Sequence, residues 1–407
     1  MSIASSSRPS APLIIGMMSG TSADGIDVAI VRCGESTELI QFNEFPMPDS
    51  LRQHILHLAT PENREDNSEI DSMGELDRIL GLAYAEAALA TIEQAGLNTD
   101  DIAAIGCHGQ TLRHRPESML PFTLQIGCAS TLAEMTGITT ISDFRSRDIA
   151  AGGEGAPLVP FAHQHLFASD QSNTAIVNIG GIANLTWIDQ QGQTTGFDIG
   201  PGNMLMDALM TNISRGSKTF DQDGALASNG QISTELLATL MTHPFLKRTP
   251  PKSTGRETFG EDMVQQIIDW PGLSDADRMA TACAFTADAI AESITMMTDT
   301  SPSGSPIAVL ICGGGARNQH LMHLLTEKLY PITVQPTDAA GIPAQAVEAI
   351  SFALLARHTL MGSPNTLATV TGATRDVCGG QITPGNNWPA LMQNIPEWID
   401  LLHINRV

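Results

Sequence analysis

One arrangement of residues occurs twice along the chain and most constrains its fold. An apolar strand, a Gly-containing turn and a second strand run over residues 13–31, and the same plan recurs over residues 174–188. The two copies begin about 160 residues apart, which is far too long a period for a solenoid of short repeats. Two such copies can arise by chance, but they favour two related α/β lobes.

The composition agrees with two lobes and excludes several classes of function. A chain of 407 residues with 42% hydrophobic residues is too long for one ordinary core. The net charge of −23 argues against nucleic acid or an anionic membrane as partner, because both attract basic surfaces. Residues 1–12 lack a basic start and a continuous apolar core, so we expect no secretory signal there, and no apolar run reaches the length of a membrane span. Six cysteines without a CxxC pair or a zinc spacing are typical of reduced thiols in a cytoplasmic protein.

The first turn of the repeated plan is rich in groups that bind phosphate. Residues 19–27 read Ser-Gly-Thr-Ser-Ala-Asp-Gly-Ile-Asp. Such a turn directs backbone N–H groups and hydroxyls at one point, although no Walker motif with its lysine occurs in the chain. A carboxylate beside a phosphate needs an intervening cation, so Asp24 or Asp27 would imply bound Mg²⁺. An ordinary hairpin with Asp/Gly turn chemistry is an equally good interpretation of this segment alone.

Further glycine-rich turns follow other expected strands. Gly313-Gly314-Gly315 comes directly after the apolar segment 307–312, and Gly180-Gly181 separates the two strands of the second copy. Residues 152–155 form another such turn. Each is explained at least as well by a tight turn as by a ligand that approaches the backbone. Several of them near strand ends favour a shared nucleotide cleft, since loops at strand ends converge in α/β folds.

An aspartate precedes the Gly-Pro-Gly turn of residues 200–202. Asp198 at the end of a strand is well placed to act as a general base, and an N-cap or turn aspartate is the alternative. Asp143 and Asp148 compete for the role of base, but each lies near an arginine that would hold it ionised in a structural pair.

Basic residues gather at three places, residues 113–115, 145–147 and 252–256. In a chain with only 21 Lys and Arg, these clusters could bind substrate carboxylates or phosphates, or they could be solvated surface. His108, flanked by Gly109, could hydrogen-bond a sugar or could be a satisfied core histidine; the two interpretations are equally good.

Together these segments resemble one family, the anhydro-N-acetylmuramic acid kinases, in the expected order over nearly the whole chain. The segments that carry the resemblance are Gly16-Met-Met-Ser-Gly-Thr-Ser-Ala-Asp-Gly-Ile-Asp27, Gly106-Cys-His-Gly-Gln-Thr111, Asp143-Phe-Arg145 with Arg147-Asp148, Gly155-Ala-Pro-Leu-Val-Pro160, Asn178-Ile-Gly-Gly181, Gly196-Phe-Asp-Ile-Gly-Pro-Gly-Asn203, Lys252-Ser-Thr-Gly-Arg256 and Cys312-Gly-Gly-Gly315.

The resemblance implies an α/β fold of the two-lobed actin/hexokinase-like type, a duplicated ribonuclease H-like fold with an ATP cleft between the lobes. We expect residues 1–140 with 358–407 to form the N-terminal lobe, which holds the phosphate-binding hairpin and part of the substrate site. Residues 141–357 would form the C-terminal lobe, with the catalytic aspartate and the nucleotide site.

The resemblance also implies roles for individual residues and the cofactors ATP and Mg²⁺. Asp198 would be the catalytic base and Glu348 a second acidic residue near the metal and phosphates, with Asp24 and Glu348 as metal ligands. Substrate would be bound by His108, Gln110, Asp143 and Arg145. The expected nucleotide-binding residues are Gly20, Thr21, Ser22, Ala23, Asp24, Gly25, Ile26, Asp27, Gly180, Gly181, Gly313, Gly314 and Gly315.

The implied reaction is ATP-dependent phosphorylation of O6 of 1,6-anhydro-N-acetylmuramic acid while water opens the anhydro bridge, in cell-wall recycling. The expected partners are this small-molecule sugar, water and a second copy of the chain in a homodimer. A plain hydroxyl kinase of an amino sugar and a non-enzymatic actin-like ATP-binding module are the alternatives. A sugar-responsive repressor lacks support, because no basic DNA-reading segment precedes Leu13.

This chain departs from the usual family pattern at a few positions. Ala23 stands where a larger aliphatic residue is common, Cys128-Ala129 where Asn-Pro is common, and Glu154 where glutamine is frequent. None of these changes removes an expected catalytic group, although Cys128 and Glu154 bear on the fine contacts with substrate.

Overall fold

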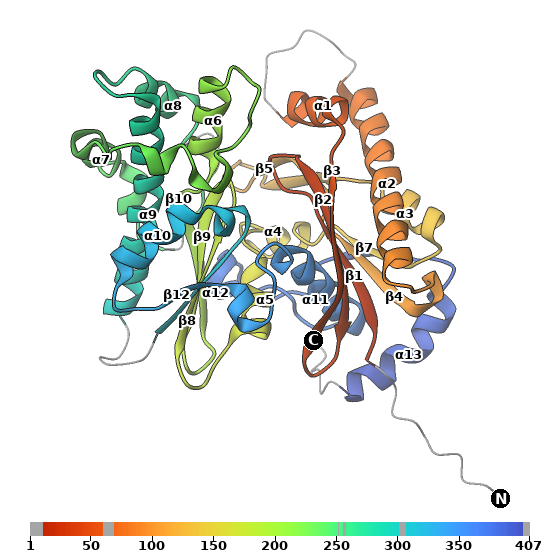
Figure 1. Ribbon diagram of the computed structural model, residues 1–407. Helices are drawn as coiled ribbons and strands as arrows, with labels where there is room; N and C mark the ends of the chain where they lie inside the picture. Colours follow the sequence, from red (N-terminus) through yellow and green to blue (C-terminus); the bar gives the residue numbers. More distant parts are fainter. Residues whose placement is uncertain (1–10, 60–68, 251, 255–257, 301–306, 402–407) are drawn as a thin grey trace, which may run out of the picture. The chain divides into compact units, whose positions relative to one another are not determined.

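The computed structural model describes residues 11–59, 69–250, 252–254, 258–300 and 307–401 (Figure 1). The contacts within the chain divide it into unit 1, residues 1–162 with 348–407, and unit 2, residues 163–347. These limits differ from the expected ones, since residues 141–162 and 348–357 belong to unit 1. Asp143, Arg145 and Glu348 therefore lie on the same unit as the expected phosphate-binding hairpin.

The sheet of unit 1 is built from six strands in the order β13-β7-β4-β1-β2-β3. β1, β2 and β3 form an antiparallel meander, β4 runs parallel to β1, β7 parallel to β4, and β13 antiparallel to β7. Between β4 and α3, two further strands form a separate antiparallel ribbon. The strands are β1 (Leu13–Met18), β2 (Gly25–Cys33), β3 (Thr37–Pro46), β4 (Ile102–Cys107), β5 (Gln110–Arg115), β6 (Phe122–Ile126), β7 (Thr140–Ser142) and β13 (Gln381–Thr383).

Helices cover both faces of this sheet. Alternate residues of β1, including Ile15 and Met17, join a buried cluster with the apolar stripe of α2. On the opposite face α11 approaches so closely that a Cβ at Gly16 would collide with the backbone oxygen of Ala349. The helices are α1 (Asp49–Ala59), α2 (Glu69–Gln94), α3 (Ala129–Thr136), α4 (Ser146–Ala150), α5 (Val159–Phe167), α11 (Val347–Met361), α12 (Ala368–Thr371) and α13 (Trp388–Leu401), with a 3-10 turn η1 (Thr99–Asp101).

The sheet of unit 2 has five strands in the order β10-β9-β8-β11-β12. β8, β9 and β10 form an antiparallel meander, while β11 runs parallel to β8 and β12 parallel to β11. The strands are β8 (Asn173–Ile179), β9 (Ile182–Ile188), β10 (Thr194–Pro201), β11 (Ile307–Cys312) and β12 (Val334–Pro336).

Unit 2 buries its own apolar core, in which the long helix α9 contributes a run of small and aromatic residues that includes Cys283 and Phe285. The helices are α6 (Met204–Ile213), α7 (Thr234–Leu240), α8 (Glu261–Ile268), α9 (Asp275–Asp299) and α10 (Gln319–Leu329). Short 3-10 turns are η2 (Gln222–Gly224), η3 (Ala227–Asn229), η4 (Pro244–Lys247), η5 (Gly314–Arg317) and η6 (Thr337–Ala340).

The two sheets share one topology. In each, a three-strand antiparallel meander is followed by two strands parallel to its first strand, so β1-β2-β3-β4-β7 corresponds to β8-β9-β10-β11-β12. This correspondence confirms the two related α/β lobes that the repeated strand–turn–strand plan predicts. Among the described residues, no helix combines the length and the apolar character needed to cross a membrane.

Candidate active site

The hairpin turn of residues 19–24 joins β1 to β2 in unit 1 and is anchored by a buried glutamine. Ser19 Oγ donates to Gln110 Oε1 at 2.8 Å, and Gln110 Nε2 donates to the carbonyl oxygen of Gly20 at 3.1 Å. Gln110 stands at the start of β5 and is only 1% exposed. Its amide is therefore engaged on both sides, which favours a role in holding the turn over direct contact with substrate.

The outer half of the same turn is fixed from α1 and β3. Arg52 Nε donates to the carbonyl oxygen of Ser22 at 3.1 Å, and the backbone N–H of Met47 donates to the carbonyl oxygen of Asp24 at 2.9 Å. Ser22 Oγ donates to Asp24 Oδ1 at 2.9 Å. Asp24 itself is exposed. The turn thus has a defined conformation and presents a carboxylate to solvent, as a site for a hydrated cation requires.

Arg145 and His108 form a second polar group in unit 1. Arg145 Nε donates to His108 Nε2 at 2.9 Å, so the imidazole proton is on Nδ1, which donates to the carbonyl oxygen of Gly109 at 2.8 Å. Burial, and next the charge of Arg145, hold the pKa of His108 well below its usual range. The neutral ring has both nitrogens engaged. This geometry makes His108 a positioning residue for the guanidinium of Arg145, and its direct contact with sugar stays a prediction.

The charges of two acidic residues, Glu348 and Asp148, act on Arg145. Burial lowers the pKa of Arg145 to about 10, while the charges of Glu348 and then Asp148 act in the opposite direction. Glu348 lies in the first turn of α11, so the two residues expected near substrate and phosphate lie near each other. Arg145 Nη1 also donates to the carbonyl oxygen of Gly155 at 2.8 Å.

The carboxylate of Asp143 holds backbone and side chains around it. Ser146 Oγ donates to its Oδ1 at 2.6 Å and Gln381 Nε2 donates to its Oδ2 at 2.6 Å. Both oxygens therefore have partners on α4 and β13, which favours a structural role, and its expected contact with substrate remains a prediction. Asp148 is likewise a structural acceptor, of the Gly155 N–H at 2.8 Å and of Thr371 Oγ1 at 2.8 Å.

In unit 2, the turn Gly180-Gly181 between β8 and β9 is tied to the start of α6. The carbonyl oxygen of Gly180 accepts from the N–H of Asn203 at 2.8 Å, and that of Gly181 from the N–H groups of Gly202 and Met204 at 2.9 and 3.2 Å. A Cβ at either turn glycine would meet only ordinary contacts, at 3.6 Å or more. The lack of side chains here is thus not required by packing and leaves room for a ligand to approach the backbone.

The three consecutive glycines after β11 differ in what they do. Gly313 has a φ of +77°, and a Cβ there would collide with Asn178 Oδ1, while a Cβ at Gly315 would collide with Ile179. A Cβ at Gly314 would lie 3.7 Å from Asn203 Nδ2, which is an ordinary contact. Packing therefore explains Gly313 and Gly315. Gly314 is the member of the triplet that remains open to a ligand.

Asp198 lies in β10 where the register with β9 shifts, between Asp198 and Gly200. Its Oδ2 accepts from the backbone N–H of Thr254 at 2.9 Å and from Ser253 Oγ at 3.2 Å. Its own N–H donates to the carbonyl oxygen of Lys252 at 2.9 Å. The carboxylate is thereby oriented and half-buried, as a general base needs to be.

The sequence reasoning did not single out Ser253 and Thr254 as the residues that orient Asp198, although they lie inside a segment that it singled out for its cations. Lys252 is itself buried, and its Nζ lies 4.9 Å from the centre of the Phe245 ring and 3.3 Å from the Leu246 carbonyl oxygen. It is therefore a structural cation. Arg256, the other cation of this segment, lies outside the described residues.

The expected residues thus form one group in each unit. Unit 1 brings together the 19–24 turn, Gln110, His108 and Arg145, with Glu348 close to Arg145. Unit 2 brings the ends of β8 and β11 and the start of α6 together, as the contacts of Gly202 and Gly313 require. Convergence of the glycine turns at strand ends, expected from the sequence, therefore holds within unit 2.

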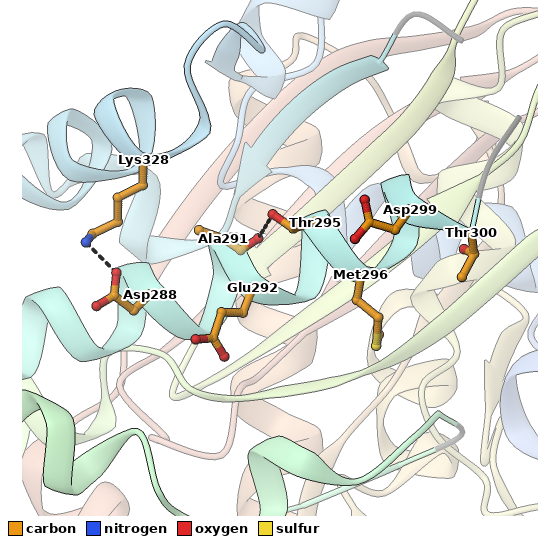
Figure 2. Close-up of a pocket in the computed structure, with 8 residues that line it drawn as sticks. All are labelled: Asp288, Ala291, Glu292, Thr295, Met296, Asp299, Thr300 and Lys328. Carbon is orange, nitrogen blue, oxygen red and sulfur yellow. Dashed lines mark hydrogen bonds and ion pairs between the residues drawn. The ribbon is translucent and has the colours of Figure 1, made fainter. Parts of the chain in front are cut away.

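Neither a metal cluster nor the pocket along α9 and α10 adds to these groups. The described part of the chain has no set of three His, Cys, Asp or Glu placed to hold a metal ion. A pocket of about 680 Å³ lies along α9 and α10. Figure 2 shows its lining, where Asp288 pairs with Lys328 and which includes Glu292 and Asp299. It contains none of the expected site residues, and its acidic lining does not suit a nucleotide.

A duplicated sheet, a polar Gly/hydroxyl/carboxylate hairpin and an oriented strand aspartate define a class of protein, the actin/hexokinase-like sugar kinases. The sequence profile of the family described as "Anhydro-N-acetylmuramic acid kinase" matches residues 12–385. The chain belongs to this family, as its motifs predict.

Curated relatives agree in length and sequence. The protein named anhydro-N-acetylmuramic acid kinase from Xylella fastidiosa is 43% identical over 367 residues, which cover 89% of this chain and 94% of that protein. The one from Coxiella burnetii is 41% identical over 377 residues, which cover 92% of this chain and 98% of that protein. One from Vibrio vulnificus is 41% identical over 364 residues, covering 89% and 96%.

Two solved structures are similar at low identity. One is the activator of the 2-hydroxyisocaproyl-CoA dehydratase from Clostridium difficile with bound ADPNP, at 12% identity and a TM-score of 0.42, covering 84% of this chain and 93% of that one. Another is a ROK family glucokinase from Streptomyces griseus in complex with glucose and AMPPNP, at 12% identity and a TM-score of 0.40, covering 85% and 98%.

Proposed function

We propose that this kinase uses ATP to phosphorylate O6 of 1,6-anhydro-N-acetylmuramic acid while water opens the 1,6-anhydro bridge. The observation that carries the proposal is the setting of Asp198, whose Oδ2 is held by Thr254 and Ser253 at the register shift of β10. Family membership supports this choice of substrate. We place the reaction in the cytoplasm, in the recycling of cell-wall sugars.

The proposed reaction forms one bond and breaks one bond at C1, and it does the same at the γ-phosphorus. Asp198 takes a proton from a water molecule whose oxygen attacks C1, and the C1–O6 bond breaks. The electron pair of that bond stays on O6, which attacks the γ-phosphorus of ATP as ADP leaves. The products are N-acetylmuramic acid 6-phosphate and ADP, and the proton on Asp198 returns to solvent. Bridge cleavage thus supplies the charge that O6 needs for an in-line displacement.

The nucleotide phosphates are assigned to the glycines that packing does not require. Gly20 in unit 1, and Gly180, Gly181 and Gly314 in unit 2, each leave the backbone accessible. Thr21, Ser22, Ala23, Gly25, Ile26 and Asp27 complete the hairpin that carries Gly20. Asp24 and Glu348 would supply hard oxygen donors to Mg²⁺, which ordinarily takes one or two protein carboxylates along with water and phosphate oxygens. When bound, this ion would neutralise charge on the transferring phosphoryl group.

Turnover in ¹⁸O-labelled water tests the proposal. We expect the label at C1 of the product and none in the transferred phosphate, read by mass spectrometry after rapid quenching because the free hemiacetal exchanges with water. Unlabelled N-acetylmuramic acid 6-phosphate incubated for the same time corrects for that exchange. An unopened phosphorylated sugar would instead indicate a plain hydroxyl kinase, label in phosphate would indicate ATP hydrolysis, and no ADP would indicate a module without this activity.

A further inference from the structure

The helix α9 contains four threonines, and one of them bonds differently from the other three. Thr281, Thr295 and Thr298 each donate to the backbone carbonyl oxygen four residues earlier in the helix, at 2.7 to 2.8 Å. This is the ordinary bond of a threonine inside a helix. Thr286 instead donates to two carbonyl oxygens of the turn that follows β10. Its hydroxyl therefore joins two elements that lie far apart in the sequence.

The bond made by Thr286 is buried and has two acceptors. Thr286 Oγ1 lies 3.1 Å from the carbonyl oxygen of Pro201 and 3.0 Å from that of Gly202. Because a hydroxyl has a single proton, the two oxygens share it in a three-centre bond. Thr286 is 0% exposed, and Pro201 and Gly202 are buried as well. Removal of the hydroxyl would therefore leave two buried carbonyl oxygens without this donor, which is unfavourable.

The turn that accepts this bond begins three residues after the proposed base. The pairing of β10 with β9 shifts register between Asp198 and Gly200, so the regular ladder is interrupted directly before the turn. An irregularity of this kind bends a strand and changes the direction of its side chains. Bonds from outside the sheet therefore help to fix the course of the chain here, and Thr286 supplies one of them from α9.

The same turn is also in contact with the turn Gly180-Gly181. The N–H of Gly202 donates to the carbonyl oxygen of Gly181 at 2.9 Å, and the N–H of Asn203 donates to that of Gly180 at 2.8 Å. A Cβ at Gly202 would collide with the carbonyl oxygen of Gly180, so the two backbones touch. A shift of residues 201–202 would therefore also move the turn to which the proposed function assigns nucleotide phosphate.

We propose that Thr286 is a positioning residue that couples the strand of the base to the phosphate-binding turn of unit 2. This inference rests on the proposed function, which assigns the base to Asp198 and phosphate contacts to Gly180 and Gly181. Because Thr286 is fully buried, it acts through the carbonyl oxygens of residues 201 and 202 and not by contact with substrate. Its hydroxyl keeps the turn in the position that serves both groups.

Steady-state kinetics of Thr286→Val tests this assignment. Valine keeps the shape of the side chain and removes the donor. Loss of one buried hydrogen bond predicts a rise in the KM for ATP of about threefold to tenfold and a fall in kcat by about the same factor. The KM for the sugar should stay as in the wild type, because the expected sugar-binding residues lie in unit 1. Thr286→Ser, which keeps the hydroxyl, should recover most of both losses.

A matched control comes from the same helix. Thr281 is also 0% exposed, and its hydroxyl donates to the carbonyl oxygen of Asp277 at 2.7 Å and accepts from the N–H of Ser233 at 3.0 Å. Thr281→Val removes these buried bonds, which do not involve residues 201–202, and it should leave both KM values unchanged. Circular dichroism melts give the folded fraction of each variant. Thr286→Ala, which also lacks the donor, takes the place of Thr286→Val should the valine variant fail to fold.

The coupling to the base is measured by combining Thr286→Val with Asp198→Asn. If Thr286 acts on kcat through the position of the Asp198 carboxylate, the fall in kcat should be much smaller in the Asp198→Asn background, where that carboxylate is already lost. The rise in the KM for ATP should persist there, because it arises at Gly180-Gly181. A loss of folded protein alone would lower the apparent kcat in both backgrounds and leave the KM for ATP unchanged.

The outcomes separate this inference from the proposed function. An unchanged KM for ATP in folded Thr286→Val, equal falls of kcat in both backgrounds, or no recovery in Thr286→Ser overturns the positioning role. Absence of turnover in the wild-type protein contradicts the proposed function instead. In that case calorimetric ATP binding still decides the role of Thr286: a weaker affinity in Thr286→Val but not in Thr281→Val supports it, and equal affinities overturn it.

Discussion

The first hairpins of the two units occupy the same place in the same sheet and yet differ in length and chemistry. Between β1 and β2 stand six residues, Ser19 to Asp24, with three hydroxyls and an exposed carboxylate. Between β8 and β9 stand two, Gly180 and Gly181, whose carbonyl oxygens are bonded to the start of α6. Unit 1 thus presents side chains at this position, and unit 2 presents bare backbone.

The third strand of each meander differs as well. In unit 2, the edge strand β10 is largely buried and carries Asp198 with its oriented carboxylate, whereas β3, the corresponding edge strand in unit 1, has no buried residue. The same topology therefore carries a different group of site residues in each unit. Strand order fixes where loops and strand ends lie, while the individual residues determine their chemistry. The proposed function accordingly assigns phosphate and metal contacts to unit 1, and backbone contacts and base catalysis to unit 2.

The largest expected effect concerns the base in unit 2. Asp198→Asn keeps the shape and the acceptor for Thr254 but removes the basic oxygen, so kcat should fall by about 10²–10⁴-fold with the ATP affinity retained. Asp189→Asn is the matched control, since Asp189 caps the turn after β9 by accepting from the N–H groups of Gln191 and Gln193. Activity near the wild-type level in Asp198→Asn would move the role of base to Glu348 or Asp143.

The next effect separates structural from ligand-facing glycines at the end of β11. Gly313→Ala places a Cβ in a left-handed conformation against Asn178, and it should lower the free energy of unfolding by about 2–4 kcal/mol. Gly314→Ala should change that free energy by less than about 0.5 kcal/mol while weakening ATP binding. Urea unfolding and calorimetry measure the two quantities. Equal destabilisation by both variants would contradict the division of the triplet.

A buried histidine of unit 2, His163, should make the stability of the wild type more sensitive to acid than that of a variant without it. His163 is fully buried with Nδ1 2.8 Å from Thr186 Oγ1, and burial lowers its pKa to about 3. Between its unfolded value near 6.5 and this folded value, only the unfolded state binds the proton, so stability falls as the pH falls, by about 1.4 kcal/mol per pH unit. Between pH 7 and pH 5, the free energy of unfolding of His163→Gln should therefore fall by about 2 kcal/mol less than that of the wild type, as measured by urea unfolding. Parallel pH profiles of the two proteins would refute this.

The smallest effect compares the two hairpins directly. Gly20→Val fills the space through which a phosphate would reach the backbone of unit 1, and Gly181→Val does the same in unit 2. We expect a loss of ATP affinity of about tenfold for Gly20→Val, which corresponds to about 1.4 kcal/mol. Gly74→Ala, at an open position of α2, is the control and should bind ATP normally. Calorimetry that detects a loss only in Gly181→Val would assign the phosphates to unit 2.

The expected elements were found where local signals are strong and missed where they are weak. β1, β8 and β11 lie within a residue of the strand segments expected at residues 13–31, 174–188 and 307–312. β5 was missed because Gln-Thr-Leu-Arg-His-Arg has a single apolar residue, and its strand conformation depends on pairing with β6.

The sequence by itself determined the duplicated α/β plan, the family, and the segments that carry chemistry, because these depend on apolar periodicity and on residue types in a fixed order. Only the tertiary structure decided which of those residues are engaged with neighbouring residues and which leave polar groups or backbone open to a ligand. It showed that Gln110, His108 and Asp143 hold neighbouring groups, and that Gly313 is a packing glycine while Gly314 is open. It also joined residues 141–162 to unit 1, through bonds such as Asp143 to Gln381. These assignments depend on contacts between residues far apart in sequence, which no local pattern encodes.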